Sequence, residues 1–531
     1  MFRTFSALRL NQRLMSSILP SVATAAAVVI CSTSAIAQPV DARINAPEQK
    51  LNNPERGGLR LQYERQGAQP GVTIKPGTPT APALDPRKSI FVTDVDTVSK
   101  LTFFDVMDQL RKQSNDPTLT PLRLFQQWWD TAAAAPGTFV GPHCEPILNG
   151  FPYRCPRPEA AEATSDPFTN PTGLQGYSAI AYSNRFDLAD VQNPGRGCGE
   201  QRVVFARNSG RTPPTPPPPA PPPNLNRLLI IFEALVPNPQ PHRGLDGCED
   251  IQKFWHSLSD NMTPAQRGDR LRDFFLNGIP AQNIRPVIHI DSYSNIGGQI
   301  RTNQFLNQGG SNGFEWTLRE FKIQNLQPGI RIIPATVKTT PDTSLFSGTA
   351  PIDLQPHFAA RIADELQNLR GGPGGTESNA ATIGLNLSRP GDDAFNPFES
   401  SENVPDRGSV ELAFKPTSLV GVYLAAKLDE LKKPGGGGTT LTVDNVIQRI
   451  QTQTCAGCHQ WSNDKPLGGG AGNWPSSLQF VHQSEQDPET VNGVQRFRIS
   501  ETLKSPGFIP ARCRIVADFL SADNSLCTNV Q

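Results

Sequence analysis

The sequence lacks an excess of charge of either sign, and beyond its first 37 residues it lacks long apolar stretches. Its 531 residues include 49 Lys and Arg against 49 Asp and Glu, so the formal net charge is zero. A balanced chain has no general electrostatic attraction for nucleic acid, and no nucleic-acid partner is expected. No stretch after residue 37 is long and apolar enough to form a transmembrane helix.

Common motifs of enzymes and metal sites are also missing. The chain contains no HExxH, no GxGxxG and no P-loop, and it has only one CxxC. These absences disfavour zinc-protease, dinucleotide-binding and P-loop chemistry, and they leave no second ligand pair for a structural zinc site. Methionine is scarce as well, and its four residues are Met1, Met15, Met107 and Met262.

Residues 1–37 have the composition of a signal peptide. Three arginines come first, an apolar and small-residue stretch follows, and Ala35-Ile36-Ala37 ends it with the small-x-small pattern that signal peptidase cleaves. An uncleaved membrane anchor is the alternative, but serine and threonine interrupt the stretch. We therefore predict an exported protein, periplasmic or secreted, with no transmembrane segment after removal of the signal.

Proline and glycine are abundant, with 51 and 44 residues. Helices tolerate neither residue well, so the predicted fold class is α+β with an antiparallel sheet. A disordered, proline-rich arm is expected at 38–90, followed by a large disulfide-bonded domain at 91–433 with a proline-rich hairpin loop at 211–224. A glycine linker at 434–438 then leads to a small, mostly α-helical domain at 439–531.

Eight cysteines follow the predicted signal peptide, and an oxidising compartment favours their pairing. Cys198 precedes the predicted strand 200–207, and Cys248 follows the predicted strand 227–236. These strands are expected to form an antiparallel hairpin, which would make the two cysteines neighbours. Six cysteines lie outside the CxxC and allow 15 connectivities. Chain position favours Cys144–Cys155, Cys198–Cys248 and Cys513–Cys527.

A group of polar residues falls in predicted strands of the large domain. Arg301, Asn303, Glu315, Arg319 and Glu320 either line a pocket or form a solvated sheet face with cross-strand charge pairs. Charged side chains are mostly exposed in folded proteins. We therefore predict the solvated face.

The stretch TQTCAGCHQW, residues 452–461, contains the clearest chemical signal. Cys455, Cys458 and His459 have the CxxCH spacing, in which two thiols reach the two vinyl groups of a haem and an imidazole lies beneath the iron. A redox disulfide is an alternative, but the βαβ context that it usually requires is absent from the sequence pattern. An amphipathic helix is predicted directly before the motif, over VDNVIQRIQT.

A second short helix is predicted near the C-terminus, over RIVADFL. With a leading helix, CAGCH, irregular loops and a closing helix, residues 439–531 resemble a c-type cytochrome domain. The resemblance implies one covalent haem c, thioether bonds to Cys455 and Cys458, and His459 as the proximal iron ligand. The large domain resembles no named family.

The chain departs from the cytochrome pattern at the second axial ligand, which is usually a downstream methionine. No methionine follows the motif, and the only later histidine is His482. The iron would therefore be bound by both His459 and His482, borrow a ligand from the large domain, or have an open sixth position. Without a methionine ligand, a lower reduction potential is expected.

Three functions are compatible with these observations. The first, which we predict, is electron transfer by an exported single-haem protein whose large domain docks a redox partner protein or a small-molecule substrate. The second is a haem-dependent oxidoreductase with an exchangeable ligand position. The third is a non-catalytic secreted binding or structural protein with Cys455 and Cys458 in disulfides.

Overall fold

A computed structural model describes most of the chain from residue 83 onwards. The described residues are 83–133, 147–148, 151–152, 157–190, 193, 195–211, 227–295, 297–306, 315–326, 329–371, 383–387, 391–401 and 409–530. The predicted signal peptide, the predicted arm up to residue 82, Cys144, Cys155 and residues 212–224 of the proline-rich loop lie outside this set.

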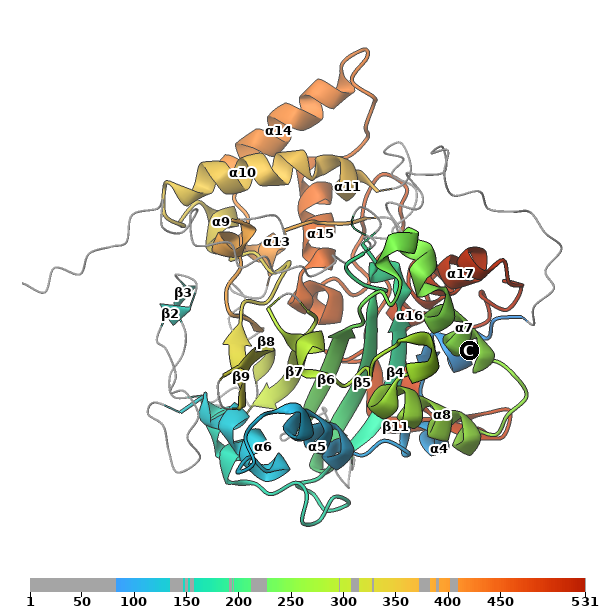
Figure 1. Ribbon diagram of the computed structural model, residues 1–531. Coiled ribbons are helices and arrows are strands. Elements are labelled where there is room, and N and C mark those ends of the chain that lie inside the picture. The colour runs from blue at the N-terminus through green and yellow to red at the C-terminus, as the bar shows by residue number, and fades with distance from the viewer. Residues whose placement is uncertain are drawn as a thin grey trace, which may run out of the picture. The chain divides into compact units, whose positions relative to one another are not determined.

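An antiparallel sheet forms the centre of the described chain (Figure 1). It has eight strands in the order β1-β4-β5-β6-β7-β8-β10, and β9 also pairs with β8. The α+β class with an antiparallel sheet is thus confirmed. The strands are β1 (Phe91–Val92), β4 (Tyr177–Arg185), β5 (Glu200–Arg207), β6 (Leu228–Leu235), β7 (Gln299–Leu306), β8 (Glu315–Asn325), β9 (Ile330–Ala335) and β10 (Glu399–Ser401).

Helices pack against the sheet through large aromatic side chains. Phe103 begins a helix whose N-terminus is closed by a capping box from Thr102, and its ring contacts Phe205 and Phe232 of the sheet. Trp128 of a second helix is fully buried in the same core. The helices around this core are α3 (Pro86–Ser89), α4 (Val95–Val98), α5 (Phe103–Gln113), α6 (Pro121–Asp130), α7 (Glu249–Ser257) and α8 (Pro264–Asn277).

A second apolar cluster lies among the later helices (Figure 1). Phe358 of α10 packs in the same cluster as Leu424 of α14, and Val446 and Ile450 of α15 complete it. The helix leading into CAGCH therefore shares its core with helices that precede the glycine run. The helices of this cluster are α9 (Ser344–Ser347), α10 (Leu354–Asp364), α11 (Leu366–Arg370), α13 (Val410–Ala413), α14 (Leu419–Lys432) and α15 (Val443–Gln453).

The C-terminal residues also pack on the sheet. They include a two-stranded antiparallel hairpin that the sequence analysis did not predict, and Phe497 of this hairpin donates its backbone N–H to the Thr93 carbonyl. Arg227 beside the sheet forms a buried ion pair with Glu485. The described residues from 83 onwards group into one compact unit, so a separate cytochrome-like domain is not confirmed. The C-terminal elements are β11 (Gln483–Val491), β12 (Val494–Ile499), α16 (Glu501–Lys504) and α17 (Ile509–Leu520).

Two of the three predicted disulfides are confirmed. Cys198 and Cys248 are bonded at the open end of the β5–β6 hairpin, where their Cα atoms are 5.4 Å apart. Cys513 in α17 is bonded to Cys527, again with 5.4 Å between the Cα atoms. Within the described part of the chain, no helix is long and apolar enough to cross a membrane.

Removal of the Cys198–Cys248 disulfide is expected to destabilise the protein more than removal of Cys513–Cys527. The first closes a loop with a sequence separation of 50 and the second one of 14. In the chain-entropy model these losses correspond to about 4 and about 3 kcal/mol. Urea unfolding of the two paired Cys→Ser variants would measure both losses. A larger loss for the shorter loop would contradict the prediction.

Candidate functional site

The CAGCH turn is fixed at the end of α15. The turn continues from this helix as a π-helical segment, η10 (Gly457–Trp461). Gly457 donates its N–H to the Thr454 hydroxyl, which itself donates to the Gln451 carbonyl. A Cβ atom at Gly457 would lie 1.8 Å from the Gln451 oxygen, so only glycine fits at this position of the turn.

Both cysteines of the motif are buried, and neither is bonded to another cysteine. The Thr340 hydroxyl donates a hydrogen bond of 3.2 Å to Cys455 Sγ, and the Ser400 hydroxyl accepts the N–H of the next residue, Ala456. Cys458 Sγ instead lies 3.5 Å from Nε2 of His482. The two thiols therefore have different surroundings, one against the end of the sheet and one against an imidazole.

His459 is oriented by a backbone carbonyl. Its Nδ1 lies 2.8 Å from the Phe480 oxygen. Because a carbonyl only accepts, Nδ1 must carry the hydrogen and donate, so in the neutral ring Nε2 keeps its lone pair. Histidines that bind metals usually donate their other ring N–H to such an acceptor. The imidazole is thus held in the tautomer that an iron ligand needs.

The sheet supports this arrangement from beneath. Asn303 in β7 donates its side-chain N–H to the Phe480 oxygen at 3.0 Å, and Trp316 in β8 donates its indole N–H to the Asn303 oxygen. The Trp316 ring also lies 5.4 Å from the His459 ring, centroid to centroid. Sequence reasoning singled out Asn303 only as a member of a polar group, because its link to His459 spans 156 positions along the chain.

His482 lies directly beside His459. The centroids of the two rings are 4.5 Å apart, and Nδ1 of His482 is 3.0 Å from the Ser500 hydroxyl. The structure therefore brings Cys458, His459 and His482 together. Among the described residues, however, no group of three or more His, Cys, Asp or Glu side chains has an arrangement that could hold a metal ion by itself.

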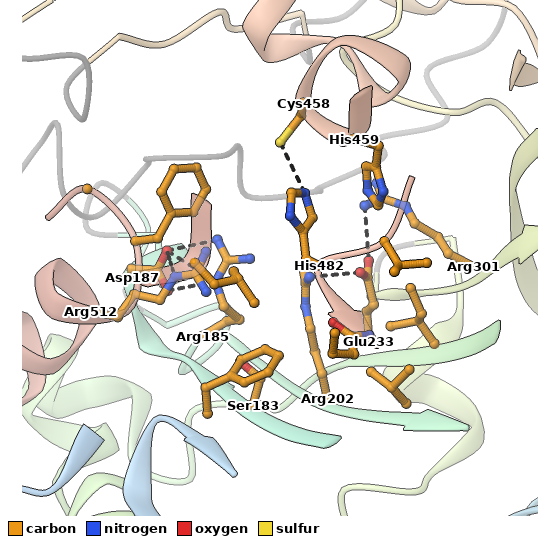
Figure 2. A pocket seen from close by; sticks show the side chains of 18 of the residues that line it. Ser183, Arg185, Asp187, Arg202, Glu233, Arg301, Cys458, His459, His482 and Arg512 are labelled. Carbon is orange, nitrogen blue, oxygen red and sulfur yellow. Dashed lines mark hydrogen bonds and ion pairs between the residues drawn. The ribbon is translucent and has the colours of Figure 1, made fainter. Parts of the chain in front are cut away.

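These residues form one wall of a cavity (Figure 2). The cavity has a volume of about 180 Å³ and opens to solvent at its mouth. Small-molecule sites typically measure about 300 to 1,000 Å³, so the cavity has room for a small ligand, and a haem would require neighbouring side chains to move. Strands of the sheet supply the opposite side, with charged residues and with apolar ones such as Val204 and Ile231.

The prediction of a solvated polar face on the sheet was wrong. Arg301, Asn303, Arg319 and Glu320 are all at least 92 % buried. The reason is that the C-terminal segments cover this part of the sheet: Asn303, for example, is bonded to Phe480, whose ring stacks on Trp316. Glu315 begins β8, but its side chain lies outside the described part of the structure.

The buried charges are arranged in pairs. Arg301 lies 3.3 Å from Glu233 and 3.0 Å from Glu320, while Arg202 contacts Glu233 at 2.9 Å and also bonds to Glu200. Burial alone would lower the pKa of Arg301, but the neighbouring carboxylates outweigh it and raise the pKa. The guanidinium therefore remains charged, and the carboxylates compensate its desolvation.

A second charged group contains Arg185, Asp187 and Arg512. Arg185 makes a bidentate contact with Asp187, with distances of 2.9 and 2.8 Å, and Arg512 Nε lies 3.6 Å from the same carboxylate. Burial would raise the pKa of Asp187, but the two arginines outweigh it and lower the pKa to about 2. Asp187 is therefore ionised at every physiological pH.

Comparison with known proteins gives no match. No protein-family model, no curated protein and no solved structure is similar to this chain at a significant level. The chemistry of the site must therefore be argued from its own residues.

The donor set can be compared with what a covalent haem requires. His459 and Cys458 line the cavity, and the orientation of His459 fits an iron ligand. An imidazole nitrogen binds a transition metal at about 2 Å, so two axial nitrogens would be about 4 Å apart and their ring centroids farther. The observed 4.5 Å between the centroids of His459 and His482 is too short for an iron between them.

Cys458 and His459 on one wall of the cavity thus suit a haem, but two other side chains would have to move before it could bind. His482 would have to turn away from His459 to accept the iron between the rings, and Cys455 would have to leave the Thr340 hydroxyl to reach a vinyl group. The residues present therefore fit the group in their chemistry, and the cavity would have to enlarge beside them to admit it.

Replacement of Asp187 by Asn is expected to lower the free energy of unfolding by about 3–5 kcal/mol at pH 7, because it leaves buried arginine charge without compensation. The folded pKa of about 2 is below the ordinary 3.8, so this stabilisation is present above pH 3.8 and is lost as the pH falls through about 2. Urea unfolding at pH 7, and then between pH 5 and 2.5, would measure it.

Asp190→Asn is the matched control. Asp190 lies three residues further along the chain and faces Arg196 at 3.6 Å in a partly exposed pair. Pairs of that kind contribute about 0–1 kcal/mol. The explanation for Asp187 would be contradicted if both variants lost the same free energy of unfolding at pH 7. It would also be contradicted if the difference in unfolding free energy between the wild type and Asp187→Asn did not decrease in acid.

Proposed function

We propose that this protein is an exported electron-transfer protein with one haem c, bound through Cys455 and Cys458 and with His459 as an iron ligand. The observation that carries the proposal is the orientation of His459 on the wall of the cavity. Its Nδ1–H is donated to the Phe480 carbonyl, which leaves Nε2 for an iron. Bound haem would supply a centre that accepts and releases one electron.

The residues of this chain would set the properties of that centre. The Phe480 carbonyl orients the His459 ring, and Asn303 and Trp316 hold that carbonyl in place through the sheet. His459 is only 8 % exposed, so the protein would shield the iron ligand from water. Solvent exposure and hydrogen bonding around the ligands are two of the factors that fix a haem potential.

Export is supported by the disulfides. Cys198–Cys248 and Cys513–Cys527 are both bonded, and disulfides persist mainly in the periplasm and outside the cell. A periplasmic or secreted location, reached through cleavage at residues 35–37, is part of the proposal. The partner would be a redox protein or a small-molecule substrate.

The cavity favours a second candidate, a haem-dependent oxidoreductase. Its walls carry charged residues that could position a substrate. The third interpretation, with Cys455 and Cys458 in disulfides, is opposed by their thiol state. If the protein proved colourless, the contact between the Cys458 thiol and the His482 imidazole would need a function other than haem binding.

The full chain, made in a host with the machinery for c-type haem maturation, is expected to be coloured. After denaturation in alkaline pyridine and reduction, its absorption should show the c-type band of a haem that stays on the chain. Cys455→Ala with Cys458→Ala should abolish the covalent haem, because no thiol remains to form a thioether. Colourless wild-type protein would contradict the proposal.

His482 would be the second iron ligand of a bound haem once its side chain has turned away from His459. The wild-type spectrum should then be low-spin and unchanged by cyanide, whereas His482→Ala should be high-spin or bind cyanide. His289→Ala is a suitable control, because His289 lies in a surface turn beside Asp291. An unchanged low-spin spectrum in His482→Ala would exclude this ligand, and a wild-type spectrum that responds to cyanide would favour the oxidoreductase.

A further inference from the structure

A second cavity lies where the C-terminal hairpin meets the central sheet, and no described residue lines both it and the cavity beside the CAGCH turn. It is bounded by both strands of the hairpin, by β4 and by the short turn that follows β5, Asn208–Gly210. β11 of the hairpin lies beside β4 (Figure 1). This hairpin cavity has a volume of about 470 Å³ and opens to solvent. Small-molecule sites typically measure about 300 to 1,000 Å³.

The hairpin holds the side chain of Arg211 on the wall of this cavity. Arg211 follows the turn Asn208–Gly210, and its guanidinium carbon lies 5.5 Å from the centre of the Phe497 ring in β12. A cation is attracted to the face of an aromatic ring in such a contact. The Gln486 side chain in β11 donates a hydrogen bond to the carbonyl of Gly210, directly before Arg211. Both strands of the hairpin therefore position the guanidinium before any ligand binds.

The charge of Arg211 has no carboxylate partner among the described residues: its guanidinium forms no ion pair and no hydrogen bond with any of them. Glu485 is the carboxylate that acts on it, but Arg227 already bonds to both oxygens of Glu485, at 2.5 and 2.8 Å. Burial has a larger effect than Glu485, so the pKa of Arg211 is lowered. Residues 212–226, which follow Arg211 and lie outside the described part of the chain, contain no Asp or Glu.

The charges of the lining indicate the head of a ligand. Among the described residues that line the hairpin cavity, only Arg211 and Glu485 are charged. Since Glu485 is occupied by Arg227, one positive charge remains available, and a ligand with one negative charge matches it. A carboxylate has that charge at neutral pH, whereas a phosphate monoester has about −1.5 to −2. The planar guanidinium can also bind both oxygens of a carboxylate at once.

The neutral polar groups of the lining indicate the body of the ligand. Thr172 donates its hydroxyl hydrogen to the side chain of Asn170. Ser178 donates in the same way to Asn208. Both hydroxyl hydrogens are thus in use, but the two oxygens can still accept hydrogen bonds. Gln495 adds an exposed amide from β12. Acceptors of this kind favour a ligand body that carries hydroxyl groups.

We propose that the hairpin cavity binds a small monocarboxylate that carries hydroxyl groups, such as a sugar acid. Its carboxylate lies against Arg211, and its hydroxyl groups donate to the oxygens of Thr172, Ser178 and Gln495. The site is independent of the haem proposal, because no described residue lines both cavities.

The test is a ligand-detected NMR titration of the full chain with three probes. D-galacturonate is the acid, D-galactose has a hydroxymethyl group in place of the carboxylate, and cyclohexanecarboxylate has the carboxylate on an apolar ring. Galacturonate is expected to bind about tenfold or more tightly than galactose, because it adds a hydrogen bond between two charged groups. It should also bind more tightly than cyclohexanecarboxylate, because only the sugar can donate to the neutral acceptors.

Arg211→Gln should weaken binding of galacturonate by about tenfold to a hundredfold and leave binding of galactose unchanged. Arg270→Gln is the matched control. The guanidinium carbon of Arg270 also lies over an aromatic ring, 5.6 Å from the centre of Phe254, but Arg270 lines neither cavity. Its replacement removes one positive charge and one ring contact, and it should leave binding of all three probes unchanged.

Equal binding of galacturonate and galactose to the wild-type chain, or binding of neither, would overturn the proposal even if the Arg211 variant failed to fold. Equal losses of galacturonate affinity in the two arginine variants would also overturn it, since net charge would then explain binding. Cyclohexanecarboxylate that binds as tightly as galacturonate would contradict the hydroxylated ligand body. A colourless protein would alter none of these outcomes, so failure of the haem proposal can be distinguished from failure of this one.

Discussion

The Phe480 carbonyl oxygen joins the CAGCH turn to the central sheet. It accepts one hydrogen bond from His459 and another from Asn303, and the Trp316 indole holds Asn303 in turn. Because all of these groups are buried, each would be costly to leave without its partner. The orientation of His459 therefore depends on two strands far from it in the sequence, and the turn cannot be understood as a unit of its own.

Placing this turn on the sheet buries many charged side chains. The structure compensates them in networks, with Arg202 and Arg301 around Glu233 and with Arg185 and Arg512 around Asp187. This pairing offsets the cost of taking the charges out of water.

Local patterns in the sequence were sufficient to predict one hairpin of the sheet and the disulfide at its ends. The β5–β6 hairpin was predicted from two β-rich segments, and the position of Cys198 and Cys248 at its ends led to the observed disulfide. In contrast, the hairpin of β11 and β12 was missed, because its first strand is polar and contains Pro488.

The sequence by itself determined the chemistry that is available: two thiols and an imidazole at fixed spacing on a turn that only Gly457 permits. Those relations are local, so they do not depend on how the rest of the chain folds. Only the tertiary structure decided that His482 lies beside His459, that Arg301 and Glu320 are buried, and that Arg301 lies in the wall of a cavity. Such features arise from contacts between distant segments, and alternation along a strand cannot show whether another segment covers it.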